Sequence, residues 1–166
     1  MDIFQFAMDK ERYSEHFYRD LARRANYVGL KNILTMLADE EVKHYRIVEQ
    51  MRSETPQEVT EAPILADAKR IFEKMKGTPR QFDFHISEVD LYRKACDIEE
   101  ESRRFYLEKA EEVTDPVQKR IFRQLAEEEN KHFMIVEGIR SFVARPQTYL
   151  ENAEFYHFDD YVGGEF

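Results

Sequence analysis

The chain has 166 residues, a net charge of −9 at pH 7 and a single cysteine. This length suits one domain with a real core, and the acidic balance argues against nucleic acid or anionic membranes as partners. One cysteine excludes an internal disulfide and any cysteine-ligated zinc or iron–sulfur site, so a reducing, cytoplasmic setting is expected. No apolar run reaches the length of a membrane span, and the N-terminus lacks the pattern of a secretion signal.

The first third of the chain predicts two long helices. Residues 3–26 form the first, with Asp2 as its N-cap and Gln5 as the reciprocal partner of that cap. Gly29 interrupts the helical pattern, and a second helix follows over residues 30–52.

A long crossover separates this pair of helices from the next. Pro56 closes the second helix, and residues 53–87 then contain only a short amphipathic helix at 64–76, which Gly77 and Pro79 end.

Two more long helices follow the crossover. Ser87 with Asp90 has the form of a capping pair for a helix over 88–113. Asp115 caps a last helix over 116–144, whose first residue is proline. At this position a backbone N–H would have no partner within the helix, so proline costs no hydrogen bond there. Short turns within each pair and one long crossover predict an all-α, antiparallel four-helix bundle of the ferritin-like type over residues 1–145.

The end of the last helix and the residues after it are less regular. Gly138 is unfavourable in a helix by about 1 kcal/mol relative to alanine, so we expect this end to bend or fray. Residues 146–166 are too apolar for a free tail and are expected to dock on the bundle or on a second subunit. The apolar side chains of this tail are Tyr149, Leu150, Phe155, Tyr156, Phe158, Tyr161 and Phe166.

An internal duplication is the most informative feature of the sequence. Residues 97–137 repeat residues 9–49 at an offset of 88, with 17 identities in 41 aligned positions. The segment LADEEVKH at 37–44 returns as LAEEENKH at 125–132. Each half therefore carries one glutamate on its first helix and a Glu-x-x-His pair on its second.

The helical periodicity decides which of these acids face the core. Residues three and four apart share one stripe of a helix, whereas neighbours point about 100° apart. Acids beside the stripe, such as Glu40 and Glu128, are therefore predicted to be solvated. The stripes carry six candidate metal ligands, namely Glu11, Glu41, His44, Glu99, Glu129 and His132.

Four carboxylates in an apolar bundle need compensating charge. Burying one unpaired ion costs on the order of several kcal/mol, and two divalent cations would balance four carboxylates. Iron and manganese accept this mixed oxygen and nitrogen ligand set, and zinc could also enter. The alternative reading, ordinary surface acids, would suit a lone Glu-x-x-His motif. Here six residues have the residue types and spacing of a metal site, lie on the inward faces of their helices and recur in both halves. This agreement favours the metal site over surface acids.

The chain resembles the rubrerythrin group of the ferritin-like superfamily over about residues 3–145. The resemblance is carried by the six ligand positions together with the Phe-Tyr pairs at 17–18 and 105–106. It implies a centre of two iron ions that reacts with peroxide or dioxygen. The chain departs from the group in two ways. Ser102 stands where rubrerythrins often carry a further glutamate, and no Cys-x-x-Cys motif is present, so electrons are expected from an external donor protein.

Two tyrosines and four other residues complete the candidates. Tyr18 and Tyr106 lie two turns from Glu11 and Glu99, and each hydroxyl is predicted to hydrogen-bond a ligand carboxylate. The alternative is an ordinary core aromatic residue whose hydroxyl has a hydrogen-bond partner. The residues predicted to lie outside the site are His16, His85 and His157, as surface or loop histidines, and Cys96, as a packing residue.

Three functions fit such a site. The leading hypothesis is an oxidoreductase that reduces peroxide or dioxygen, as a homodimer or larger homo-oligomer. A ferroxidase feeding iron storage would use the same centre but would need a hollow assembly or an encapsulating partner. A metal-stabilised structural or sensor protein would bind metal without turnover.

Overall fold

The computed structural model describes residues 2–53, 59, 63–78 and 81–160, and within these ranges all regular structure is helical. Four predicted features lie outside these ranges: Pro56, Pro79, Tyr161 and Phe166. None of the described helices combines the length and the apolar character needed to cross a membrane.

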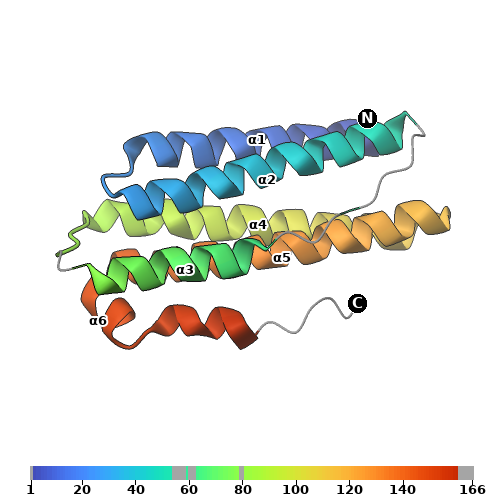
Figure 1. Ribbon diagram of the computed structural model, residues 1–166. Coiled ribbons are helices and arrows are strands. Elements are labelled where there is room, and N and C mark those ends of the chain that lie inside the picture. The colour runs from blue at the N-terminus through green and yellow to red at the C-terminus, as the bar shows by residue number, and fades with distance from the viewer. Residues whose placement is uncertain (1, 54–58, 60–62, 79–80, 161–166) are drawn as a thin grey trace.

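Two helical hairpins face each other, and together they form the four-helix bundle that the sequence predicts (Figure 1). The first hairpin joins α1 (Ile3–Arg24) to α2 (Val28–Arg52), and the second joins α4 (Ile86–Glu112) to α5 (Pro116–Ala144). The helices within each hairpin pack closely, whereas the contacts between the hairpins are sparser. Side chains between the hairpins therefore have to fill the centre of the bundle.

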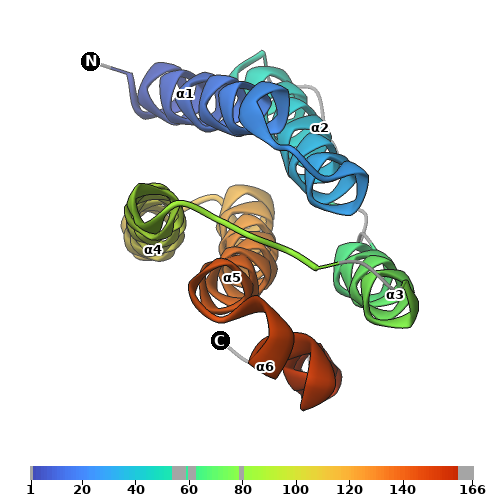
Figure 2. The same cartoon turned by 90° about the vertical axis from the view of Figure 1, so that its left-hand side faces the viewer.

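The crossover helix α3 (Ile64–Gly77) lies on one side of the bundle, alongside α2 and α5 (Figure 2). Its buried residues include Ala68 and Phe72, which are fully covered. No described helix covers the opposite side, between α1 and α4, in the same way. The bundle thus has one covered and one uncovered long side.

The start of α1 agrees with the prediction in part. Asp2 caps the helix, since its carboxylate accepts a 2.8 Å hydrogen bond from the Phe4 N–H. Gln5 does not return to the cap, and that part of the prediction is wrong. Its side chain instead donates to Asp9 one turn along the helix and accepts from Arg52 on α2.

Two other helix starts lie earlier than predicted. His85, rather than Ser87, caps α4, because its ring Nδ1 accepts from the Ser87 N–H while Glu88 accepts from the backbone N–H of His85. Asp90 takes no part in this cap and pairs with Arg93. Gly29 does not interrupt the helical pattern, since α2 begins at Val28 and Gly29 is its second residue.

The tail from Pro146 forms α6 (Pro146–Glu151) and a 3₁₀ helix (Glu154–Asp160), which pack on α3 and α5. The buried aromatic rings of Tyr149, Phe155 and Phe158 meet Phe72 of α3 at centroid distances of 5.2, 5.9 and 6.3 Å. α5 continues through Gly138 to Ala144, so the prediction that the helix frays at Gly138 is wrong. A Cβ atom at position 138 would lie 2.9 Å from both Phe158 and the Tyr149 hydroxyl. The glycine therefore lets the tail approach the helix.

Two separate apolar clusters fill the bundle. One contains Tyr18, Leu37, Tyr92 and Ile139 and continues beneath α3 and the tail. The other contains Ala7, Val48, Tyr106 and Phe122 near the opposite end. The level between them holds polar residues, and it is the level of the predicted ligands.

Candidate metal centre

All six predicted ligands lie between the two apolar clusters, and none is more than 2% exposed. α1 and α4 each contribute one glutamate, while α2 and α5 each contribute a glutamate and a histidine one turn later. This arrangement follows from the helical stripe, since residues three apart on a helix share a face.

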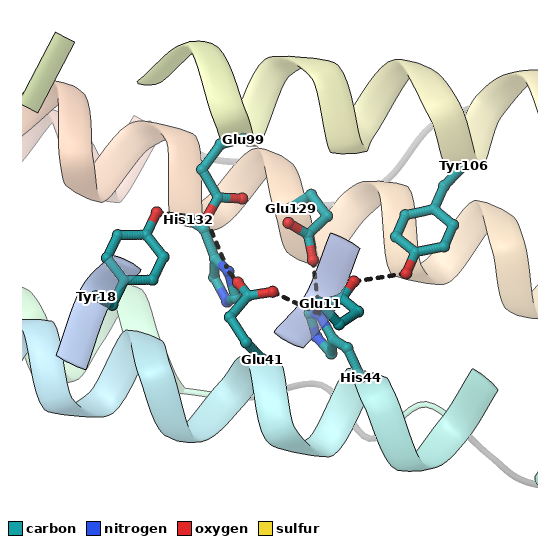
Figure 3. Close-up of polar contacts among 8 residues, drawn as sticks. All are labelled: Glu11, Tyr18, Glu41, His44, Glu99, Tyr106, Glu129 and His132. Carbon is teal, nitrogen blue, oxygen red and sulfur yellow. Dashed lines mark hydrogen bonds and ion pairs between the residues drawn. The ribbon is translucent and has the colours of Figure 1, made fainter. Parts of the chain in front are cut away.

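Two overlapping groups of ligand atoms result, each with its atoms within 4.8 Å of one another. One group is Glu11, Glu41, His44 and Glu129, and the other is Glu41, Glu99, Glu129 and His132. Glu41 and Glu129 belong to both groups. In the arrangement of Figure 3, these two carboxylates could bridge two cations, and Glu11 and Glu99 would each serve one.

The histidines reach across the bundle to the opposite hairpin. His44 Nδ1 on α2 lies 2.6 Å from Glu129 Oε1 on α5, and His132 Nδ1 on α5 lies 2.7 Å from Glu41 Oε1 on α2. The two imidazole rings are stacked, with centroids 5.3 Å apart. Each imidazole therefore aims its Nδ1 at the carboxylate cluster, as a metal ligand would.

The two tyrosines also reach across the bundle. Tyr18 on α1 donates a 2.5 Å hydrogen bond to Glu99 on α4, and Tyr106 on α4 donates a 2.5 Å bond to Glu11 on α1. The tyrosines flank the cluster on opposite sides (Figure 3). The sequence predicted a bond from each hydroxyl to a ligand carboxylate, and both bonds are present.

Burial and the neighbouring charges shift the pKa values at this site. Burial, reinforced by the nearby charges of Glu99 and Glu11 respectively, raises the pKa of Tyr18 and of Tyr106 well above its usual range. Both phenols therefore keep their protons and remain donors. Burial and then the charge of Glu11 raise the pKa of Glu41 in the metal-free protein.

The other carboxylates divide in the same way. Burial and then the charge of Glu99 raise the pKa of Glu129 well above the ordinary value. Burial acts in the same direction on Glu11 and Glu99, but the neighbouring side chains, first Glu41 and Glu129 respectively and then the two histidines, stabilise the charged form more strongly, so both pKa values are lowered. The two carboxyl groups that belong to both ligand groups, Glu41 and Glu129, thus favour the protonated form. Glu11 and Glu99, which belong to one group each, favour the charged form.

One oxygen of each of the four candidate ligand carboxylates lacks a hydrogen-bond partner. The four atoms are buried, and they are Oε2 of Glu11, Glu41, Glu99 and Glu129. An unsatisfied buried carboxylate oxygen costs free energy, and carboxylates of this kind in both ligand groups form a favourable site for cations. The donor set of oxygens with two imidazole nitrogens fits iron or manganese, so the residues present suit a pair of such ions.

The remaining candidates lie where the sequence placed them, with one exception. His16 is exposed, His85 caps α4, His157 lies in the 3₁₀ helix, and Cys96 is buried. Glu128 was predicted to be solvated, and this is wrong. It is 5% exposed and forms a 2.8 Å ion pair with Lys131, which is 3% exposed. The signal in the sequence was the Glu–Lys spacing of three, which allows a pair on one helix.

Comparison with known proteins supports this description. A solved structure of a hypothetical protein from Pyrococcus furiosus matches with a TM-score of 0.64 and 23% identity, over 86% of this chain and 89% of that chain. At this identity the likeness shows the fold alone. No curated protein matches the chain. The sequence pattern of the rubrerythrin family matches residues 2–139, which is most of the chain. The chain therefore belongs to the rubrerythrin family.

Proposed function

We propose that this protein is a di-iron oxidoreductase that reduces peroxide or dioxygen at the centre of the bundle. The observation that carries the proposal is the pair of overlapping ligand groups that share Glu41 and Glu129. A structural metal site is usually closed by four ligands around one ion, whereas two groups with shared carboxylates suit two neighbouring ions. Manganese or zinc could occupy the same ligands.

A reduced iron pair supplies Lewis acidity and two electrons for cleavage of an O–O bond. The chain supplies the geometry and a dry environment. Tyr18 and Tyr106 hold Glu99 and Glu11 in fixed orientations through their hydroxyl protons, and the apolar clusters on either side exclude water from the ligands.

The partners follow from this chemistry as further proposals. Reduction of one peroxide to two water molecules takes two electrons and two protons, and reduction of dioxygen to water takes four of each. The protons come from solvent, and the electrons must come from an external donor protein. We also propose a cytoplasmic setting, in keeping with the single free cysteine, and a homodimer or larger homo-oligomer.

Anaerobic loading with ferrous iron, followed by one equivalent of hydrogen peroxide per iron pair, tests the reaction. Rapid oxidation by peroxide, one equivalent per two irons, is expected, with slower oxidation by dioxygen. Slow or non-stoichiometric peroxide consumption would count against the proposal. Oxidation driven by dioxygen in a large hollow assembly, detected by size in solution, would indicate a ferroxidase for iron storage.

Metal binding without turnover is the third possible outcome. If chelation lowers the melting temperature while neither oxidant changes the iron-loaded protein, the centre is structural or sensory. The proposed reaction would then be rejected.

A further inference from the structure

A pocket opens between residues of α1 and α4. Figure 2 shows that these two helices lie on the side of the bundle away from α3. Its volume is about 340 Å³. Phe6 and Tyr13, which line it, are 42% and 53% exposed, whereas Ser14 and Ser102, which also line it, are only 2% and 3% exposed. The pocket therefore runs from the surface to two buried serines.

The two serines lie one helical turn from two of the candidate ligands, on the same faces of α1 and α4. Ser14 follows Glu11 by one turn on α1, and Ser102 follows Glu99 by one turn on α4. They occupy equivalent places in the duplication, since 14 plus the offset of 88 is 102. The corresponding positions after the glutamates of α2 and α5 hold the histidine ligands. Among these four equivalent positions, the small side chains are therefore those on α1 and α4.

The other approaches to the centre are filled. The apolar clusters close the bundle on both sides of the ligand level, and α3 lies along the gap between α2 and α5. The remaining long faces are the closely packed hairpins themselves. The ligands are at most 2% exposed, so an external molecule has to pass between described helices to reach them.

We propose that this pocket is the passage by which a molecule the size of peroxide reaches the centre, and that Ser14 and Ser102 form its inner gate. The proposal rests on the proposed function and adds to it a limit on substrate size. The volume of the pocket accommodates several water-sized molecules. We place its narrow part at the hydroxymethyl groups of the two serines together with the Ile98 side chain, which belongs to the same lining. Small peroxides pass this gate, and bulky organic hydroperoxides are retarded.

Azide binding to the iron-loaded, oxidised protein provides a test that does not depend on turnover. Ser14→Leu and Ser102→Leu narrow the gate, and Ser14→Ala and Ser102→Ala are the matched controls. The leucine variants should slow azide association on the order of tenfold and dissociation by the same factor, because a passage changes rates and leaves the affinity unchanged. The alanine variants should keep the wild-type rates.

Widening the passage supplies a second arm that does not depend on the leucine variants folding. Ile98 lines the pocket and is half-buried, so Ile98→Ala should accelerate azide association. A leucine variant that retains two irons and binds azide at the wild-type rate overturns the proposal, and so does an unchanged rate in Ile98→Ala. If the wild-type protein takes up no iron at all, the proposed function itself fails, and metal content distinguishes this result from the others.

Discussion

Tyr18 and Tyr106 are single residues on which the orientation of two ligands depends. Tyr18→Phe removes the 2.5 Å hydrogen bond to Glu99 Oε1, whose remaining neighbour is the His132 ring nitrogen at 3.6 Å. Loss of such a partner beside a metal typically weakens metal affinity by about 10- to 100-fold. We expect weaker iron binding and a shifted absorption spectrum of the oxidised centre. Tyr156→Phe on the surface is the control. An unchanged spectrum and unchanged iron affinity in Tyr18→Phe would reject the positioning role.

The four glutamates differ in the number of cations that each could serve. Glu41 belongs to both ligand groups, whereas Glu11 belongs to one. Glu41→Gln should therefore weaken both cation positions, and Glu11→Gln should leave one of them occupied. Metal content after dialysis measures the difference. Glu40→Gln, one residue away, alters a pair with Lys43 outside the cluster and should retain two metals. Equal metal loss in Glu40→Gln and Glu41→Gln would contradict the assignment.

Cys96 gives a prediction on pH. Burial raises the pKa of its thiol to about 12. In the unfolded chain the pKa of the thiol is about 8.5. The contribution of this raised pKa to the free energy of unfolding is therefore complete below that pH and is lost as the pH rises toward the pKa of the folded state. At pH 8 the folded protein should react with a thiol reagent far more slowly than the urea-unfolded protein. Equal rates in the two states would show that the thiol is accessible.

At the residue scale, periodicity was sufficient to identify the ligands and the two tyrosines as inward-facing. The duplication supplied the symmetry of the pattern. It could not supply the crossing of the hydrogen bonds, because the sequence does not give the distance between hairpins. Glu128 shows the same limit, since a buried ion pair and two solvated charges have the same sequence pattern.

Gly138 is the residue through which α5 and the tail are linked. In Gly138→Ala, the gain in helix propensity is about 1 kcal/mol. The added Cβ would lie 2.9 Å from the Phe158 ring and from the Tyr149 hydroxyl, and overpacking of this kind costs about 1–3 kcal/mol. The steric cost is the larger, so we expect a net decrease in the free energy of unfolding, measured with urea.

Gly77→Ala, at the end of α3, is the control for the substitution in α5. No atom lies within 4 Å of the Cβ that this substitution adds. It should be neutral or slightly stabilising. If Gly138→Ala were as stable as Gly77→Ala or more so, the tail would not be packed on α5 as described.

At the scale of elements, the number of long helices and their order followed from Gly, Pro and apolar spacing. The ends were less predictable. A histidine can cap a helix through an unprotonated ring nitrogen, as His85 does, and this depends on its tautomer and not on its spacing. Gly29 lies within α2 and Gly138 within α5, whereas helix propensity alone predicted an interruption at Gly29 and a bend or fraying at Gly138. At Gly138, propensity does not report the close approach of Phe158 and Tyr149 from the tail, which an added Cβ atom would meet at 2.9 Å.

For the whole molecule, we predict that metal binding and folding are linked. The cluster of buried carboxylates costs free energy that bound cations would offset, so the metal-loaded protein should melt at a higher temperature than the chelated protein. Metal at about 100 times its dissociation constant adds about 2.7 kcal/mol. For a chain of this size that corresponds to roughly 5–10 °C. Calorimetry with and without a chelator measures the shift, and no change on chelation would show that the ligands are not engaged by metal.

The crossed hydrogen bonds have a consequence for the origin of the chain. Each ligand group takes residues from both hairpins, and each tyrosine orients a carboxylate that belongs to the other hairpin. A single hairpin therefore holds no complete site. An ancestral peptide of half this length could have assembled one only by pairing with a second copy of itself, and gene fusion would have made that pairing permanent.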